Sequence, residues 1–167
     1  MKRLYMLCGA MGVGKTTVGK ALRDMLPACA FLDGDWCWDM HPFAVTPVTR
    51  RVVLDNICHV LNNFLTCGAF ENVVFCWVLH RREILAEVLG RLDARGWEVC
   101  PVALTCTPEA LRARIGADVR AGLRDADVLE RALEYLPMYA ALGVPLLDVS
   151  ACTPEEAAGR IREGIAQ

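Results

Sequence analysis

Apolar residues follow two different patterns along the chain. Short uninterrupted apolar runs predict buried strands, whereas apolar positions that recur every three or four residues predict amphipathic helices. The run 73–79 contains no polar position, which is typical of a strand covered on both faces in the middle of a parallel sheet. The segment 46–67 keeps its apolar residues on one helical face, which predicts a long helix packed against that sheet.

The two patterns alternate from one end of the chain to the other. We predict strands at residues 3–8, 30–32, 73–79, 98–104 and 144–149. We predict helices at 15–26, 46–67, 82–94 and 107–115, a helix ending near residue 141, and a closing helix from residue 153. This alternation predicts right-handed crossovers and a doubly wound α/β fold, and a chain of 167 residues suits one domain, 1–167. Ligands of such folds bind at the carboxyl ends of the strands.

A glycine-rich loop separates the first predicted strand from the first predicted helix. It fills the pattern G-x-x-x-x-G-K-[ST], in which backbone N–H groups and a helix N-terminus close around phosphate groups. Lys15 is expected to be exposed in the empty loop and to reach the β- and γ-phosphates, while the Thr16 hydroxyl ligates Mg²⁺. The predicted nucleotide-binding residues of the loop are Gly9, Gly12, Val13, Gly14, Lys15, Thr16 and Thr17.

Two aspartates separated by one glycine follow the second predicted strand. Phosphoryl transfer needs an acid that holds the water around magnesium and often a base that accepts a hydroxyl proton. Asp33 and Asp35 supply two carboxylates at the right edge of the sheet. The alternative is an Asp-Gly turn whose acids are simply solvated.

The phosphate loop, the segment Leu32-Asp33-Gly34-Asp35 and the chain ending around 147–156 together resemble small P-loop kinases. That group includes shikimate, gluconate and adenylylsulfate kinases and chloramphenicol phosphotransferase. The resemblance implies a three-layer α/β/α fold with a five-stranded parallel sheet in the order 2-3-1-4-5. It also implies a short helical lid at about 116–127 and transfer of a phosphoryl group from ATP, with Mg²⁺, to a small acceptor.

The resemblance also implies roles for individual residues. Asp33 would lie near the magnesium water and Asp35 near the acceptor hydroxyl. Arg114 would pack on the adenine, which the loop beginning at Ser150 would border. Either Arg120 or Arg124 would be the lid arginine that closes on the transferring phosphoryl group. For either arginine, a solvated helix face is the alternative.

The acceptor site is harder to read from the sequence. Trp36 and Trp38 directly follow Asp35, where they either stack on a ring of the acceptor or fill the core. His80 and Arg82 follow the central strand, and an arginine at that position suits an anionic group. These four residues are the candidate acceptor-binding side chains beside Asp35.

The composition of the chain restricts its possible binding partners and cellular compartment. Hydrophobic residues make up 54% and charged residues 23% of the chain, and the net charge of −2 provides no global attraction to nucleic acid or anionic membranes. Nine cysteines without a C-x-x-C pair, together with apolar runs too short for a membrane-spanning helix, indicate a reduced, cytoplasmic and soluble protein. Its oligomeric state is left open between a monomer and a homodimer. We therefore expect an ATP-dependent small-molecule kinase that transfers the γ-phosphoryl group to a hydroxyl or a phosphate of its acceptor. A nucleoside or nucleotide kinase with the same machinery and a nucleotide-binding regulator without turnover are the alternatives, and a nucleic-acid end kinase lacks the basic track it would need.

Overall fold

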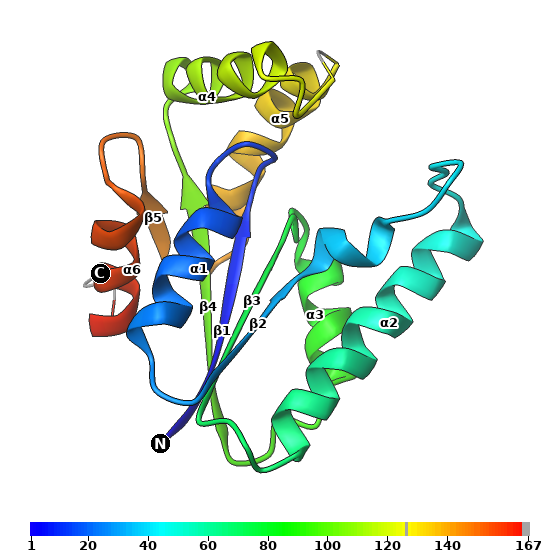
Figure 1. Cartoon of the computed structure of the whole chain (residues 1–167), viewed down its shortest axis with the longest axis vertical. Coiled ribbons are helices and arrows are strands. Elements are labelled where there is room, and N and C mark those ends of the chain that lie inside the picture. Colours follow the sequence, from blue (N-terminus) through cyan, green and yellow to red (C-terminus); the bar gives the residue numbers. More distant parts are fainter. Residues whose placement is uncertain (126, 165–167) are drawn as a thin grey trace.

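A computed structural model describes residues 1–125 and 127–164 of the chain (Figure 1). The strands are β1 (Lys2–Gly9), β2 (Cys29–Asp33), β3 (Asn72–Trp77), β4 (Trp97–Thr105) and β5 (Leu146–Asp148). The helices are α1 (Lys15–Met25), α2 (Pro47–Thr66), α3 (Arg82–Gly90), α4 (Pro108–Arg120), α5 (Val128–Tyr135) and α6 (Pro154–Glu163), with 3₁₀ turns η1 (Gly34–Trp38) and η2 (Leu136–Ala141).

The five strands form one parallel sheet in the order β2-β3-β1-β4-β5, which confirms the predicted fold class and strand order. β1 lies in the centre, paired with β3 on one side and β4 on the other. Most residues of β1 and β3 are buried, because helices cover both faces of the sheet. This burial explains why their sequences are apolar without alternation.

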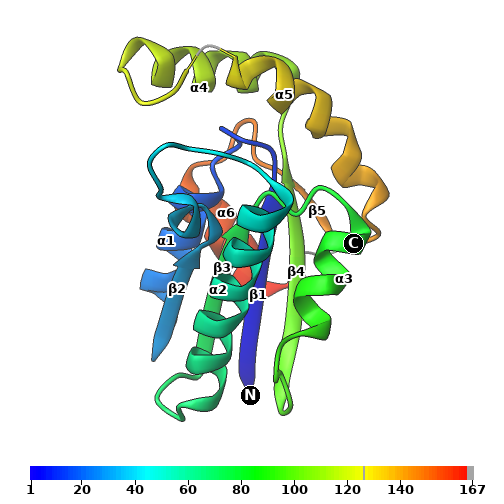
Figure 2. The ribbon, with the colours of Figure 1, turned by 90° about the vertical axis from the view of Figure 1, so that its right-hand side faces the viewer.

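The helices form layers on the two faces and an arch over one end (Figures 1 and 2). α1 and α6 pack against one face of the sheet, and α2 and α3 lie on the other. α4 and α5 run across the carboxyl ends of the strands, above the loop that joins β1 to α1. Among the described residues, none of the helices is long and apolar enough to pass through a bilayer.

Element boundaries differ from the predicted ones where a local feature interrupts the pattern. β3 ends at Trp77 rather than at residue 79, because Leu79 has a positive φ of 38° that an extended strand does not allow. α4 continues to Arg120, five residues beyond the predicted helix end. The last strand is only three residues long. Pro145 precedes it, and its carbonyl accepts a hydrogen bond from the Ala103 N–H.

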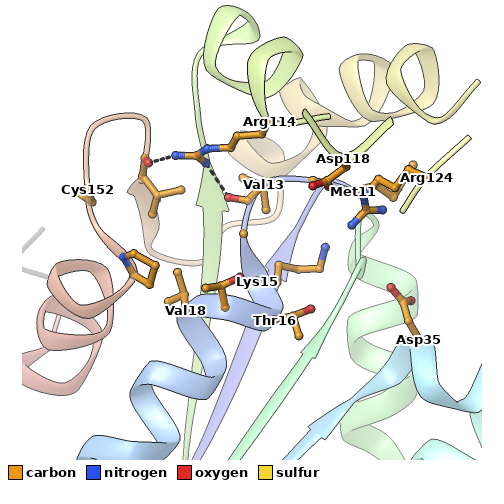
Figure 3. A pocket seen from close by; sticks show the side chains of 15 residues that line it. Met11, Val13, Lys15, Thr16, Val18, Asp35, Arg114, Asp118, Arg124 and Cys152 are labelled. Carbon is orange, nitrogen blue, oxygen red and sulfur yellow. Dashed lines mark hydrogen bonds and ion pairs between the residues drawn. The ribbon is translucent and has the colours of Figure 1, made fainter. Parts of the chain in front are cut away.

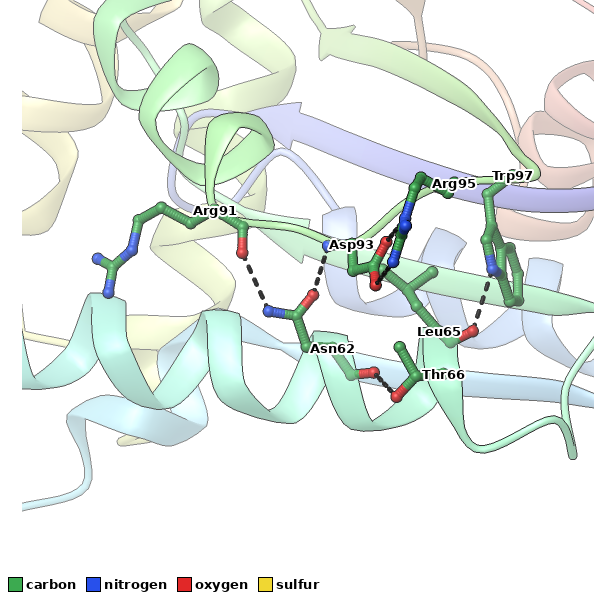
Figure 4. A network of polar contacts seen from close by, with 7 residues as sticks. All are labelled: Asn62, Leu65, Thr66, Arg91, Asp93, Arg95 and Trp97. Carbon is green, nitrogen blue, oxygen red and sulfur yellow. Dashed lines mark hydrogen bonds and ion pairs between the residues drawn. The ribbon is translucent and has the colours of Figure 1, made fainter.

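A polar network fixes the far end of α2 to the loop before β4 (Figure 4). The Asn62 amide donates to the Arg91 carbonyl at 3.0 Å and accepts from the Asp93 N–H at 2.7 Å. The Trp97 indole N–H donates to the Leu65 carbonyl at 3.1 Å. The other end of α2 is its N-terminus, which follows the segment after η1. The network therefore anchors the C-terminal end of the helix, whereas most residues of its first turns are exposed.

Candidate functional site: a phosphate loop joined to an aromatic pocket

The loop between β1 and α1 has a backbone that accepts few residues other than glycine. Gly12 has a φ of +76°, and a Cβ there would lie 2.5 Å from the Ile115 side chain under α4. Gly14 has a φ of +110° and precedes the first turn of α1, and no side chain of the described residues caps that turn. The N–H groups of that turn therefore remain free for an anion, and the helix dipole favours one. The loop fits a phosphate group.

Lys15 lies differently from the exposed position expected from the sequence. Its side chain is buried, and its ammonium group donates to the Ala10 carbonyl at 2.9 Å. Burial lowers the pKa of Lys15, while the Asp35 and Asp33 carboxylates act in the opposite direction. The loop folds around the amine, so the charge is already inside the site before a ligand arrives.

A chain of hydrogen bonds joins α1 to the end of β2. The Thr16 hydroxyl donates to Asp33 Oδ2 at 2.6 Å, and the Asp35 N–H donates to Asp33 Oδ1 at 3.0 Å. Asp33 is buried, so both of its oxygen atoms are held in place. The hydroxyl and the carboxylate are hard oxygen donors side by side, which is the chemistry that Mg²⁺ prefers.

Asp35 occupies a more open position than Asp33. Its surface is partly exposed to solvent, yet the surrounding protein removes water from much of the neighbourhood of its carboxyl group. This desolvation raises the pKa of Asp35, and the nearby Asp33 carboxylate adds to that rise. Lys15 and Arg124 oppose it. Figure 3 shows Asp35 and Arg124 facing the space beyond Lys15 from opposite sides. An anionic group bound here would lie near two cations, Lys15 and Arg124, and one carboxyl group, Asp35.

Arg114 ties the phosphate loop to the loop after β5. Its guanidinium group donates to the Val13 carbonyl at 2.8 Å and to the Val149 carbonyl at 2.6 Å (Figure 3). A third, longer contact reaches the Ser150 carbonyl at 3.4 Å. The side chain therefore holds the relative position of two loops from a third element, α4.

The two candidate lid arginines lie in different surroundings. Arg124 lines the phosphate pocket and forms an ion pair with Asp118 at 2.8 Å, with about a third of each side chain exposed. Arg120 is exposed on α4 and is not among the residues that line that pocket. The predicted lid, 116–127, spans the end of α4 and the connection to α5, and its residue 126 lies outside the described residues.

Two cavities meet in the centre of the site. One, of about 350 Å³, surrounds the phosphate loop and extends past Arg114 to Cys152 and Pro154. The other, of about 590 Å³, lies over the ends of β2 and β3. Met11 and Asp35 line both cavities, so Asp35 stands at the junction between them. A group bound in one cavity would meet a group bound in the other at Asp35.

The second cavity is lined mainly by aromatic and aliphatic side chains. Trp38 packs on Phe43 with ring centroids 6.0 Å apart, and His80 stacks on Tyr135 at 4.2 Å. Trp77, at the end of β3, completes this aromatic lining. The structure thus brings Trp38 and His80 together with Asp35, as the candidate acceptor residues require.

Other candidate residues lie elsewhere. Trp36 is 55% exposed and packs edge-on against Phe31, outside the described lining of both cavities. Arg82 is likewise absent from that lining, and its guanidinium group donates to the Ala141 carbonyl at 2.8 Å. The Ser150 hydroxyl accepts the Thr107 N–H at 2.8 Å, which caps the link between β4 and α4. Each of these side chains has a visible structural partner.

Sequence reasoning missed several lining residues. Trp77 ends a buried strand and was therefore within reach of a rule based on strand ends. Tyr135 and Arg131 come from α5, and nothing in the sequence fixes where that helix lies over the strand ends.

Among residues 1–125 and 127–164, no three His, Cys, Asp or Glu side chains lie close enough together to hold a metal ion. A magnesium ion at this site would therefore depend on Thr16 and Asp33 together with phosphate oxygens and water.

The strand order, the phosphate loop and the helical arch over it define the fold of the small P-loop kinases, which confirms the resemblance. Residues 6–129 match the family described as "AAA domain", and the chain belongs to that family. A comparison with curated proteins found no significant match in sequence.

Solved structures share the fold over nearly the whole chain. The tunicamycin resistance protein of Deinococcus radiodurans aligns with a TM-score of 0.69 and 16% identity, over 99% of this chain and 98% of that one. A gluconokinase from Sinorhizobium meliloti aligns with a TM-score of 0.67 and 20% identity, over 96% and 92%. Shikimate kinase from Acinetobacter baumannii, in complex with shikimate, aligns with a TM-score of 0.63 and 19% identity, over 98% and 92%. At these identities the similarity concerns the fold.

Proposed function

We propose that the protein is an ATP-dependent small-molecule kinase that transfers the γ-phosphoryl group to a hydroxyl group of an acceptor. The observation that carries this proposal is the position of Asp35, which lines both the phosphate cavity and the aromatic cavity. A phosphoryl donor in the first cavity and an alcohol in the second would meet at that carboxylate. The kinases among the fold neighbours support the same class of reaction.

The protein side chains take separate parts in this reaction. The acceptor oxygen forms a bond to the γ-phosphorus, the bond from that phosphorus to the leaving ADP oxygen breaks, and the hydroxyl proton passes to Asp35. Lys15 and Arg124 compensate the negative charge on the transferred group. Mg²⁺, held by Thr16 and through water by Asp33, would supply additional charge neutralisation at the phosphates.

Asp35 is better suited than Asp33 to act as the base. Both oxygen atoms of Asp33 already accept hydrogen bonds, from Thr16 and from the Asp35 backbone. Asp35 lies open to the acceptor cavity, and its raised pKa brings it closer to the value that a general base needs near neutral pH. Asp33→Asn should therefore weaken Mg²⁺-dependent nucleotide binding, with partial recovery at high Mg²⁺. Asp35→Asn should leave ATP affinity nearly unchanged and lower kcat by roughly 10²–10⁴.

The proposal is tested with Lys15→Ala and a matched control, Lys20→Ala. Lys20 lies on the same helix but is exposed. Both variants should retain the far-UV circular dichroism of the wild type. Only Lys15→Ala should lose ATP turnover, measured as ADP release with a panel of alcohols. Turnover that survives in Lys15→Ala would refute the kinase assignment, and ATP binding without turnover for any alcohol would identify the protein as a nucleotide-binding regulator.

A further inference from the structure

The charge around the aromatic cavity restricts what can bind there. Its described lining contains two carboxylates, Asp35 and Asp39, and a single cation, Arg131. Arg131 is paired with Asp127, at 3.2 Å, one turn away on the same helix. The cavity is therefore acidic on balance, although the neighbouring phosphate cavity is rich in cations.

The basic residues closest in sequence do not change this balance. Arg81 and Arg82 follow β3 directly, where the sequence suggests an anion site, but neither is part of the described lining. Arg82 is committed to the Ala141 carbonyl. His80 does line the cavity, and its Nδ1 atom is buried with no hydrogen-bond partner among the described residues. Burial, and after it the charge of Arg81, lower the pKa of His80, which favours the neutral ring.

The shape of the lining restricts the acceptor in a second way. Flat side chains come from two places: Trp38 and Phe43 follow β2, and the stacked pair His80 and Tyr135 connects β3 with α5. Trp77 adds a third aromatic surface between these segments along the sheet. Such a lining favours the binding of a ligand with a flat, apolar ring system, because aromatic side chains bind rings by stacking and by edge-to-face contact.

We propose that the acceptor is an alcohol with a flat, apolar ring system and no anionic group, bound in the aromatic cavity with its hydroxyl at Asp35. This inference rests on the proposed kinase function for the reaction but concerns the binding selectivity of the cavity. A carboxylate or phosphate on the acceptor would face Asp39 and Asp35, and the one cation in the described lining, Arg131, would have to give up its ion pair with Asp127 to reach it. A sugar acid or a nucleoside monophosphate is therefore disfavoured, and a ring-bearing neutral or cationic alcohol is favoured.

The charge requirement is tested with three indole alcohols that differ in charge. Tryptophol is neutral, tryptophanol is a cation, and indole-3-lactate carries a carboxylate. Their affinities for the wild-type protein are measured by calorimetric titration without ATP. Tryptophol and tryptophanol should each bind on the order of tenfold tighter than indole-3-lactate. Asp39→Lys should reduce or reverse the preference, since it replaces one of the two opposing carboxylates by a cation.

The stacking requirement is tested with a pair of tryptophan variants. Trp38→Leu should weaken tryptophol binding roughly two- to tenfold, whereas Trp36→Leu, at the exposed tryptophan outside the cavity, should leave it unchanged. Equal or tighter binding of indole-3-lactate to the wild type, or equal effects of the two variants, would overturn the inference. Selective tryptophol binding with no phosphorylation of any alcohol would refute the kinase function while the selectivity of the cavity remained. Phosphorylation confined to anionic alcohols would support the kinase function and overturn the proposed selectivity of the cavity.

Discussion

Replacing Arg114 tests most directly how much its hydrogen bonds to two loops stabilise the site. It is partly buried on α4, and its guanidinium group bonds to the carbonyls of Val13 and Val149 at 2.8 and 2.6 Å. Arg114→Met keeps most of the aliphatic stem but removes all of these donors. The two loops, which border the phosphate cavity, would then lose a side chain that connects both of them to α4.

The expected cost follows from the number and kind of bonds. Hydrogen bonds that involve a charged group contribute about 1.5–3 kcal/mol each, and the carbonyls left behind are close enough to solvent to recover part of that with water. We expect a loss of about 2–4 kcal/mol in the free energy of unfolding. For a domain of this size each kcal/mol lowers Tm by about 2–4 °C, so a decrease of roughly 4–16 °C is expected.

The assay compares Arg114→Met with Arg112→Met by differential scanning calorimetry and by titration with ATP and Mg²⁺. Arg112 is exposed on the same helix and makes no side-chain hydrogen bond or ion pair among the described residues, so its variant should melt within about 1 °C of the wild type. Arg114→Met should also bind ATP less tightly, because both loops border the phosphate cavity. Equal melting temperatures and equal ATP affinities for the two variants would refute the view that Arg114 joins the loops.

Three further predictions concern other parts of the molecule. Asn62→Ala should destabilise the protein by about 1–3 kcal/mol in urea unfolding, since it breaks two hydrogen bonds to the loop before β4, and a loss equal to that of the exposed control Asn63→Ala would contradict this. The raised pKa of Asp35 means that folding favours its protonated form, so the resulting stabilisation is complete at low pH and lost as the pH rises through the folded-state pKa. Asp35→Asn should therefore melt above the wild type at pH 7, with the difference shrinking toward pH 3, and a difference that does not change with pH would contradict the shift. Hydrogen exchange in residues 116–125 should slow when nucleotide and acceptor are both bound, and protection in the free protein equal to that of β3 would indicate a fixed helix rather than a lid.

The architecture was predictable because its determinants are local and repeated. The unbroken apolar run around Val73 and Phe75 indicates burial on both faces, and the structure buries both residues completely. The predicted helix starts at residues 46 and 153 are each a threonine followed by proline, and both threonines form capping boxes in the structure. Errors occurred where one residue departs from its surroundings, as at Leu79, whose positive φ ends the strand early.

The two halves of the candidate site differ in how much of them the sequence could specify. The phosphate loop is built from one continuous segment whose glycines and lysine serve a fixed geometry, so its pattern can be recognised without any tertiary information. The aromatic cavity is assembled from the ends of β2 and β3 and from α5, and its net charge depends on which arginines turn toward it. The sequence favours Arg82, which follows a strand end, yet Arg131 lines the cavity and Arg82 bonds to a backbone carbonyl outside that lining. The charge of the cavity lining is therefore a property of how α5 lies over the carboxyl ends of the strands, and an anion site inferred from arginines near a strand end has to be checked against where their side chains go.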